Sequence, residues 1–137
     1  MKTGYKVSDL MTASPIKLDI LSTAKDCAEI MEKNDVGSVL ITKNNKLAGI
    51  VTEEDLVKKV VKNDLIASKV PIVKIMTPVK YIISIEPNKD IHDALVVMKE
   101  NDIRRLPVMT KNELHGLITS KDILKIQPDL FELLADT

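Results

Sequence analysis

Two short segments of the chain carry the residues best suited to binding chemistry. One reads GIVTEED and spans residues 49–55, and the other reads GLITSKD and spans residues 116–122. In each segment a threonine follows an apolar run, and an aspartate stands three residues later, at Asp55 or Asp122. A helix that begins at such a threonine offers free main-chain amides to an anion, and the aspartate can accept two hydrogen bonds from a ribose diol. The pattern therefore indicates a nucleotide-binding site.

The same spacing is also typical of simple helix capping. Thr52 with Asp55, and Thr119 with Asp122, match a capping box, in which a hydroxyl and a carboxylate satisfy the first amides of a helix. Acidic residues are also favoured at that end of the helix dipole. Capping and ligand binding can coexist, so the residue pattern leaves both interpretations open.

The arginines give a second indication of phosphate chemistry. Of the 20 Lys and Arg residues, only the neighbours Arg104 and Arg105 are arginines. Their planar guanidinium group suits phosphate, whereas the alternative is a weak surface ion pair with Glu100 or Asp102. Neighbours on a strand face opposite ways, and alternation groups Arg104 with the apolar Leu106. We therefore expect Arg105 to be the residue that meets a ligand.

An internal repeat organises the chain. A shift of 67 positions aligns residues 23–59 with residues 90–126, and about a quarter of the aligned pairs are identical, well above the roughly three identities expected by chance. Each copy is too short to bury a large core alone, so two copies are expected to share one. The predicted organisation is repeat 1 with the N-terminal segment at 1–66, repeat 2 at 67–126, and a C-terminal tail at 127–137.

The same order of elements is predicted in both copies. A short apolar stretch, at residues 16–20 or 81–85, precedes residues that favour a helix N-cap, and an amphipathic helix follows. Two strand-like runs joined by a short polar turn come next, and a second helix starts at the threonine. The fold class is therefore α+β, with the order β-α-β-β-α twice. The expected buried helix positions are Ala24, Cys27, Ala28 and Met31 in one copy and Ile91, Ala94, Leu95 and Met98 in the other.

The end of the chain is predicted to be an apolar tail. Proline at position 128 cannot continue the last helix. The apolar residues of the tail are expected to pack on the module or on a second copy of the chain, and they are Leu130, Phe131, Leu133 and Leu134.

Composition excludes several classes of function. The chain has 137 residues, 45% of them apolar, and its 20 basic and 20 acidic residues cancel to a net charge of zero. Zero net charge and three aromatic residues argue against a nucleic-acid footprint, although a local lysine group at 58, 59 and 62 could act weakly. The single cysteine, Cys27, cannot form an internal disulfide, no secretory run opens the chain, and no apolar stretch approaches the roughly 18 residues of a membrane span. We therefore expect a cytoplasmic protein without membrane contact.

These motifs together resemble a known family. The Met-Thr pairs at 11–12 and 76–77, the runs VGSVLI and RRLPV, and the GIVTEED and GLITSKD segments are similar, in their order, to a tandem pair of cystathionine β-synthase (CBS) domains over about residues 7–126. The resemblance implies two repeats packed by their sheets around a pseudo-twofold axis, with two clefts that hold adenosine-type ligands. The usual ligands are AMP, ADP, ATP and S-adenosylmethionine, and many such modules form a disc-like homodimer.

The resemblance also assigns roles to residues. Asp55 and Asp122 would accept the ribose hydroxyls, and Thr52 and Thr119 would lie near ribose or phosphate. Arg104 or Arg105, together with Lys80, would meet phosphates. The residues after each Met-Thr pair would flank the base, and these are Ser14, Pro15 and Ile16 in one copy and Val79, Lys80 and Tyr81 in the other. Ser38 and Pro107, on the second strand of each repeat, complete the predicted set.

The two copies differ at the predicted phosphate contact, because Gly37 and Ser38 stand where the second copy has its arginines. We therefore predict one competent nucleotide site, centred on Thr119 and Asp122, and a second site around Thr52 and Asp55 that is weaker or takes a less charged ligand.

The predicted function is regulatory. The module would signal energy or metabolite state to a separate partner protein through a ligand-induced shift between arrangements. The alternative is a ligand-independent scaffold for dimerisation or protein interaction. An enzyme is not expected, because His92 and His115 are isolated from any nucleophile and no metal-ligand spacing occurs. No catalytic residue, metal or resident cofactor is predicted.

Overall fold

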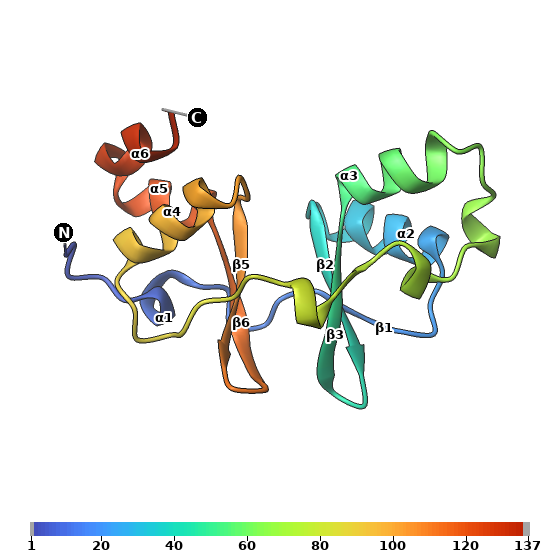
Figure 1. Cartoon of the computed structure of the whole chain (residues 1–137), viewed down its shortest axis with the longest axis horizontal. Coiled ribbons are helices and arrows are strands. Elements are labelled where there is room, and N and C mark those ends of the chain that lie inside the picture. The colour runs from blue at the N-terminus through green and yellow to red at the C-terminus, as the bar shows by residue number, and fades with distance from the viewer. Residues whose placement is uncertain (1, 136–137) are drawn as a thin grey trace. The chain divides into compact units, whose positions relative to one another are not determined.

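The structure is a computed structural model that describes residues 2–135 (Figure 1). The chain divides into two compact units. One contains Pro15–Ile82 and is called here the Thr52 unit. The other contains Met1–Ser14 and Ile83–Thr137 and is called the Thr119 unit. Each is described by itself.

The Thr52 unit has the predicted order of elements. Strand β1 (Lys17–Asp19) leads to helix α2 (Ala24–Asn34), the hairpin of β2 (Ser38–Lys43) and β3 (Lys46–Thr52), and helix α3 (Glu53–Leu56). A π-helical segment, Val57–Val61, extends α3, and 3-10 turns follow at Ala67–Lys69 and Ile72–Lys74. Strand β4 (Thr77–Pro78) and a last 3-10 turn (Val79–Tyr81) end the unit. The sheet order is β1-β2-β3-β4, in which only β1 and β2 run parallel.

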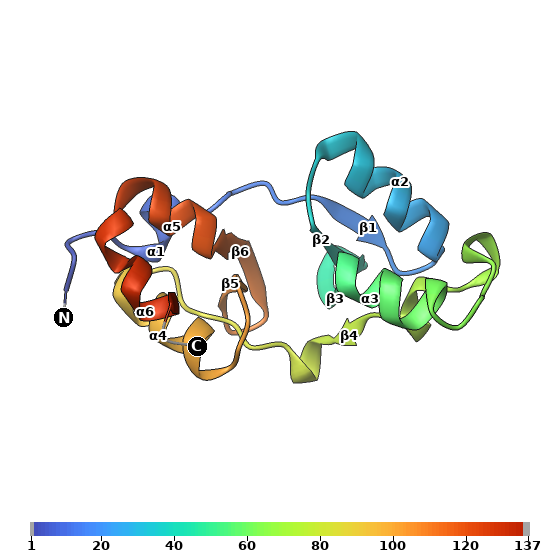
Figure 2. The ribbon, with the colours of Figure 1, turned by 90° about the horizontal axis from the view of Figure 1, so that it is seen from above.

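The Thr119 unit repeats this order in reduced form. It contains α1 (Val7–Leu10), α4 (Ile91–Glu100), β5 (Arg105–Thr110), β6 (Glu113–Thr119), α5 (Ser120–Ile126), a 3-10 turn (Pro128–Phe131) and α6 (Glu132–Ala135). Figures 1 and 2 show α4 and α5 on one face of the β5–β6 hairpin.

The first strand predicted in the second copy, at residues 81–85, is wrong in extent. Only Ile85 pairs with β5, through a parallel bridge to Val108. Tyr81 belongs to a 3-10 turn, which limits the strand on its N-terminal side. Pro87 has no N–H to donate and limits the strand on its C-terminal side. The extended segment is therefore too short for a ladder like that of β1.

Each unit includes a Met-Thr segment that precedes the other repeat in sequence. Thr12 exchanges two main-chain hydrogen bonds with Leu117 of β6, at 2.8 and 3.0 Å, and Thr77 pairs with Ile50 of β3. The close approach explains a shared glycine: a Cβ on Gly116 would lie 2.5 Å from the carbonyl oxygen of Thr12. A Cβ at the equivalent Gly49 would lie 2.8 Å from that of Thr77. The sequence repeats at 1–66 and 67–126 thus describe the duplication, while each compact unit combines segments of both.

Each unit has a core cluster of its own, so the expectation of one core shared by the two copies is wrong. Both cores are aliphatic, as the composition predicts. In α4 all four predicted positions are fully buried, and Leu106, Val108 and Ile118 of the hairpin pack against them. In α2 the predicted burial is confirmed for Ala24, Cys27 and Met31 and is wrong for Ala28, which is exposed.

The tail packs on the Thr119 unit as one of the two predicted alternatives. Leu130 is buried and Leu133 packs against the same core, whereas Phe131 is exposed. The side chain of Leu134 lies outside the described residues. None of the helices within residues 2–135 is long and apolar enough to cross a membrane.

Candidate functional site

Both Thr-x-x-Asp motifs form complete capping boxes. Thr119 Oγ1 accepts a hydrogen bond from the Asp122 amide at 3.2 Å, and Asp122 Oδ2 accepts one from the Thr119 amide at 2.9 Å. Thr52 and Asp55 repeat these contacts at 3.3 and 2.9 Å. The capping interpretation is therefore confirmed in both copies. In the Thr119 unit the capping bonds use Oδ2 of Asp122 and leave Oδ1 outside the box.

The second carboxylate oxygen distinguishes the two copies. Oδ1 of Asp55 lies 3.2 Å from Nζ of Lys59, which also donates to the carbonyl oxygen of Ile75 at 2.9 Å. The residue equivalent to Lys59 is Ile126, and within residues 2–135 no cation lies within 4.0 Å of the Asp122 carboxylate. Asp122 is thus the aspartate with an oxygen left for another donor. Sequence analysis missed Lys59, which the i,i+4 rule for helical ion pairs would have found.

Arg105 lies beside the Thr119 cap. In the β5–β6 register Arg105 is directly opposite Thr119, so the two side chains project from the same face of the hairpin. Leu106 belongs to the core on the opposite face, which confirms the predicted alternation. Arg105 is half-buried, and Arg104 is exposed.

The predicted alternative for the arginines was a surface ion pair. Within the described part of the chain, neither arginine forms an ion pair with Glu100 or Asp102. Both guanidinium groups therefore remain available to other anions.

The corresponding place in the Thr52 unit is acidic. Ser38 lies opposite Thr52 in the β2–β3 register and is buried. Glu53 follows Thr52, and its carboxylate lies so near Gly37 that a Cβ there would be 2.6 Å from Oε1. Glu54 comes next and is exposed. The Thr52 helix thus begins with three acidic residues, whereas the Thr119 helix begins with a serine, a lysine and one aspartate.

The predicted base-flanking residues are divided between the two units. Ser14 follows the Thr12–Leu117 pairing and belongs to the Thr119 unit, whereas Pro15 and Ile16 belong to the Thr52 unit. The turn at Val79–Tyr81 comes directly after β4 and also belongs to the Thr52 unit.

Lys80 and Pro107 occupy different surroundings. The Nζ atom of Lys80 lies 5.0 Å from the centre of the Tyr81 ring. Pro107 is buried, and its carbonyl oxygen accepts from Ile85 N at 3.0 Å. Because Lys80 and Arg105 belong to different units, their joint contact with phosphate stays a prediction.

A cavity of about 580 Å³ adjoins Asp122 within the Thr119 unit. Tyr5 and Leu10 of the N-terminal arm and Lys125 and Ile126 of α5 contribute to its lining. Nothing in the motif predicted the arm at this position, because the arm and α5 are more than a hundred residues apart in sequence.

The cysteine and the histidine of β6 lie outside the two capping motifs. Burial, followed by the charge of Asp55, raises the pKa of the Cys27 thiol to about 11, so the thiol stays protonated near neutral pH. His115 Nε2 lies 2.9 Å from Thr110 Oγ1. Within residues 2–135, no group of three or more His, Cys, Asp or Glu side chains could hold a metal ion.

Comparison with known proteins identifies the repeat. The family model described as the CBS domain matches residues 7–62 and 70–129. An uncharacterised protein of Methanopyrus kandleri is 35% identical over 124 residues, which is 89% of this chain and 60% of that protein. The chain therefore spans about 60% of the length of that relative.

Solved structures are similar over nearly the whole chain. An uncharacterised conserved protein from Pyrococcus horikoshii has a TM-score of 0.83 at 21% identity, covering 93% of this chain and 95% of that one. The CBS domain pair of protein MJ0100, crystallised with 5′-methylthioadenosine and S-adenosyl-L-methionine, has a TM-score of 0.78 at 25% identity, covering 90% and 99%.

Proposed function

This chain belongs to the CBS domain family, whose paired domains are regulatory modules, and we propose that it binds an adenosine nucleotide around Thr119, Asp122 and Arg105. The ligand would be AMP, ADP or ATP at this site, and its binding would report energy state to a separate partner protein. Asp122 would accept the ribose hydroxyls, and Arg105 would meet phosphate.

The observation that carries the proposal is the position of Arg105 opposite Thr119. Cross-strand neighbours on one face have Cβ atoms roughly 5 Å apart, so a phosphate beside Thr119 would lie within reach of the Arg105 guanidinium group. Lys121 adds a second cation in the first turn of α5. The oxygen of Asp122 that the capping box does not use is suited to a ribose hydroxyl.

The complex of the MJ0100 domain pair supports an adenosyl ligand for this fold at 25% identity. The ligands in that complex carry no phosphate. We propose a comparable uncharged or cationic adenosyl ligand for the Thr52 unit, because Glu53, Glu54 and Asp55 would repel phosphate. Ser38, and the turn Val79–Tyr81 with its lysine, would contribute there.

Isothermal titration calorimetry tests the proposal. AMP, ATP, S-adenosylmethionine and adenosine are titrated into the wild type, Arg105→Ala and the matched control Arg104→Ala. AMP and ATP should lose about tenfold in affinity with Arg105→Ala, adenosine should lose little, and Arg104→Ala should resemble the wild type. Equal losses for AMP and adenosine would contradict the phosphate role of Arg105.

A second candidate function is a scaffold that needs no ligand. The complete capping boxes favour it, because capping alone explains both threonines and both aspartates. Ligands that bind only the native state raise its melting temperature by mass action. No shift with any adenosyl compound at millimolar concentration would favour the scaffold.

We also propose that the module forms a homodimer. Val57 and Val61 are 57% and 71% exposed, while Leu56 and Val60 of the same turns pack into the core. A helical segment that is apolar on both sides is normally covered on both sides. Sedimentation equilibrium of the wild type and Val61→Lys measures this, and a monomeric wild type would contradict it.

The module is proposed to act by binding alone, in the cytoplasm. A reducing compartment suits its one cysteine, which is buried. Incubation with ATP should leave the nucleotide unchanged, and hydrolysis that Asp122→Ala abolishes would contradict a purely regulatory role.

A further inference from the structure

The segment before α4 forms an open edge of the β5–β6 sheet. Ile85 is bonded to β5 on both of its main-chain groups: its N–H donates to Pro107 O at 3.0 Å, and its carbonyl oxygen accepts from Met109 N at 2.9 Å. In an extended segment the neighbouring residues direct their main-chain groups the other way. The main-chain N–H and C=O groups of Ser84 and Glu86 therefore point away from β5.

Three of the four outward main-chain groups of this edge lack partners among the described residues. Among residues 2–135, neither main-chain group of Ser84 forms a hydrogen bond, and neither does the Glu86 amide. The carbonyl oxygen of Glu86 accepts only from Lys89 N, at 3.3 Å, in the turn that leads to α4. The Ser84 amide, the Ser84 carbonyl and the Glu86 amide are thus free to bond to an added strand, and they have the spacing that a strand requires.

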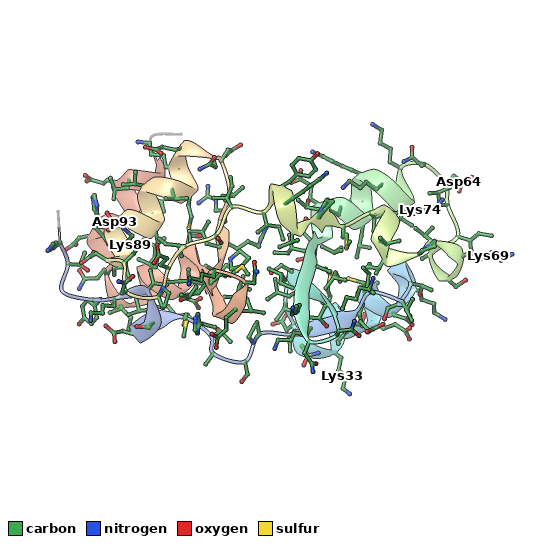
Figure 3. The ribbon with its side chains drawn as sticks, turned by 60° about the horizontal axis from the view of Figure 1, so that its bottom comes forward. Lys33, Asp64, Lys69, Lys74, Lys89 and Asp93 are labelled. Carbon is green, nitrogen blue, oxygen red and sulfur yellow. The ribbon has the colours of Figure 1, made fainter. Side chains whose placement is uncertain are left out.

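A cavity of about 510 Å³ lies between this edge and α4. Val96 and Val97, both half-buried, form its apolar wall. Lys89, in the turn before α4, and Asp93 of α4 line it too (both are labelled in Figure 3), and the cavity also includes Glu86. The cavity is therefore apolar on one side and carries two carboxylates against one ammonium group.

We propose that this edge, with the adjoining cavity, binds an extended segment of a partner protein as an added strand. Addition of a strand satisfies exposed main-chain groups of an edge, and pockets beside the edge select alternate side chains. The segment would direct an apolar side chain toward Val96 and Val97 and a basic one toward Glu86 and Asp93. This site is independent of the nucleotide site, because Arg105 and Thr119 are not part of it.

The other repeat supplies an internal contrast. The residues equivalent to Val96 and Lys89 are Glu29 and Ser22. Glu29 is exposed on α2, so the apolar wall is interrupted there by a charge. The proposal therefore applies to the Thr119 unit, and Val96→Glu imitates a residue that the same helix position already tolerates in the other repeat.

The test uses as the probe a blocked hexapeptide in which lysine and valine alternate at every second position with serine between them, so that both project from one face of an added strand. Amide NMR of the full chain follows its binding. The expected result is that the Glu86 and Ser84 amides shift and exchange more slowly, while the Ile85 amide, already bonded to β5, changes little. Val96→Glu should weaken binding about tenfold. Ser84→Pro, which removes an edge N–H, should do the same. The melting temperatures of both variants control for folding.

Two further peptides keep the test decisive if a variant fails to fold. A peptide with N-methylated amides cannot pair with an edge, and one with glutamate in place of lysine would meet Glu86 and Asp93. Both should bind at least about tenfold more weakly than the lysine peptide. Equal binding of the N-methylated peptide, or shifts that avoid residues 84–86, would overturn the proposal.

Discussion

The helices that start at Thr52 and Thr119 share one capping box and differ in what surrounds it. In the Thr52 unit, Lys59 neutralises the second oxygen of Asp55, and two glutamates follow the cap. In the Thr119 unit no cation within residues 2–135 pairs with that oxygen, and an arginine stands across the strand pair. Local helix chemistry thus preserves the motif in both copies, while neighbours one helical turn or one strand away set the charge around each cap.

Helices α2 and α4, which occupy equivalent places in the two repeats, differ in how far they are buried. Leu95 of α4 is fully buried, whereas the equivalent Ala28 of α2 is exposed. Leu95→Ala should therefore lower the free energy of unfolding by about 2–5 kcal/mol through lost burial and the cavity left behind. Ala28→Ser is the matched control and should change it by about 0.5 kcal/mol or less. Guanidinium denaturation measures both, and similar losses would show that the contrast in burial is incorrect.

Charge reversal in the first helical turn should sharpen the difference between the two sites. Lys121→Glu gives the Thr119 helix an acidic start like that of the Thr52 helix, at an exposed position. The affinity for AMP should fall roughly 5- to 10-fold, because a cation near the phosphate becomes an anion in a well-solvated place. Calorimetry at low salt measures the change. Adenosine is the control ligand, and an equal loss for adenosine would argue against phosphate binding at this helix.

Sequence predicted the features that depend on local pattern. The hairpins, the helix starts and the buried stripes of α2 and α4 followed from capping residues and periodicity. The burial of Ala28 was predicted wrongly because alanine fits an apolar stripe on a helix whether or not another element covers that position. The strand predicted at residues 81–85 is reduced to a single bridge at Ile85. Strand propensity could not show this, because it says nothing about the turn that precedes Ile85.

The site was predictable to a similar degree. Alternation predicted that Arg105 and not Arg104 faces away from the core, and the register places Arg105 opposite Thr119. Contact of Arg105 with a ligand stays a prediction. The ion pair of Lys59 could be found from i,i+4 spacing, but the contact of Lys59 with Ile75 could not, because it joins segments that only tertiary packing brings together.

The ion pair between Asp55 and Lys59 should be reproducible in the other repeat. Replacing Ile126, which lies four residues after Asp122, with lysine should create it there. Ile126→Lys, at a residue that is 49% exposed, should pair with Asp122 as Lys59 does with Asp55. Such a pair should stabilise the unit by about 0.3–0.5 kcal/mol. It should also weaken nucleotide binding a few-fold, because it occupies the oxygen proposed for ribose.

Thermal denaturation and calorimetry measure the two effects of Ile126→Lys. Ile126→Gln is the matched control, because it is polar and of similar length but uncharged. If both variants weaken binding equally, the ion pair is not the cause.

The N-caps of α2 and α4 differ in what they hold in place. Thr23 caps α2 with a hydroxyl, whereas Asp90 caps α4 and also holds the N-terminal arm. Partial desolvation raises the pKa of Asp90, but hydrogen bonds from His92 N, from Thr3 N and Oγ1 and from Gly4 N outweigh it and hold the pKa below its ordinary value of 3.8. Because the folded-state pKa is the lower one, the stabilisation is present above the unfolded-state value and is lost as the pH falls through the folded-state value.

Acid should therefore release the arm. NMR of the Thr3 and Gly4 amides as a function of pH should show a transition below about pH 4, where the carboxylate is protonated. Asp90→Asn should shift these amides already at pH 7 and remove the transition, since the amide side chain does not titrate in this range. A transition of unchanged midpoint in Asp90→Asn would assign the acid response to another carboxylate, and Asp9, which bonds Lys6 N in the same arm at 2.8 Å, would be the next to replace.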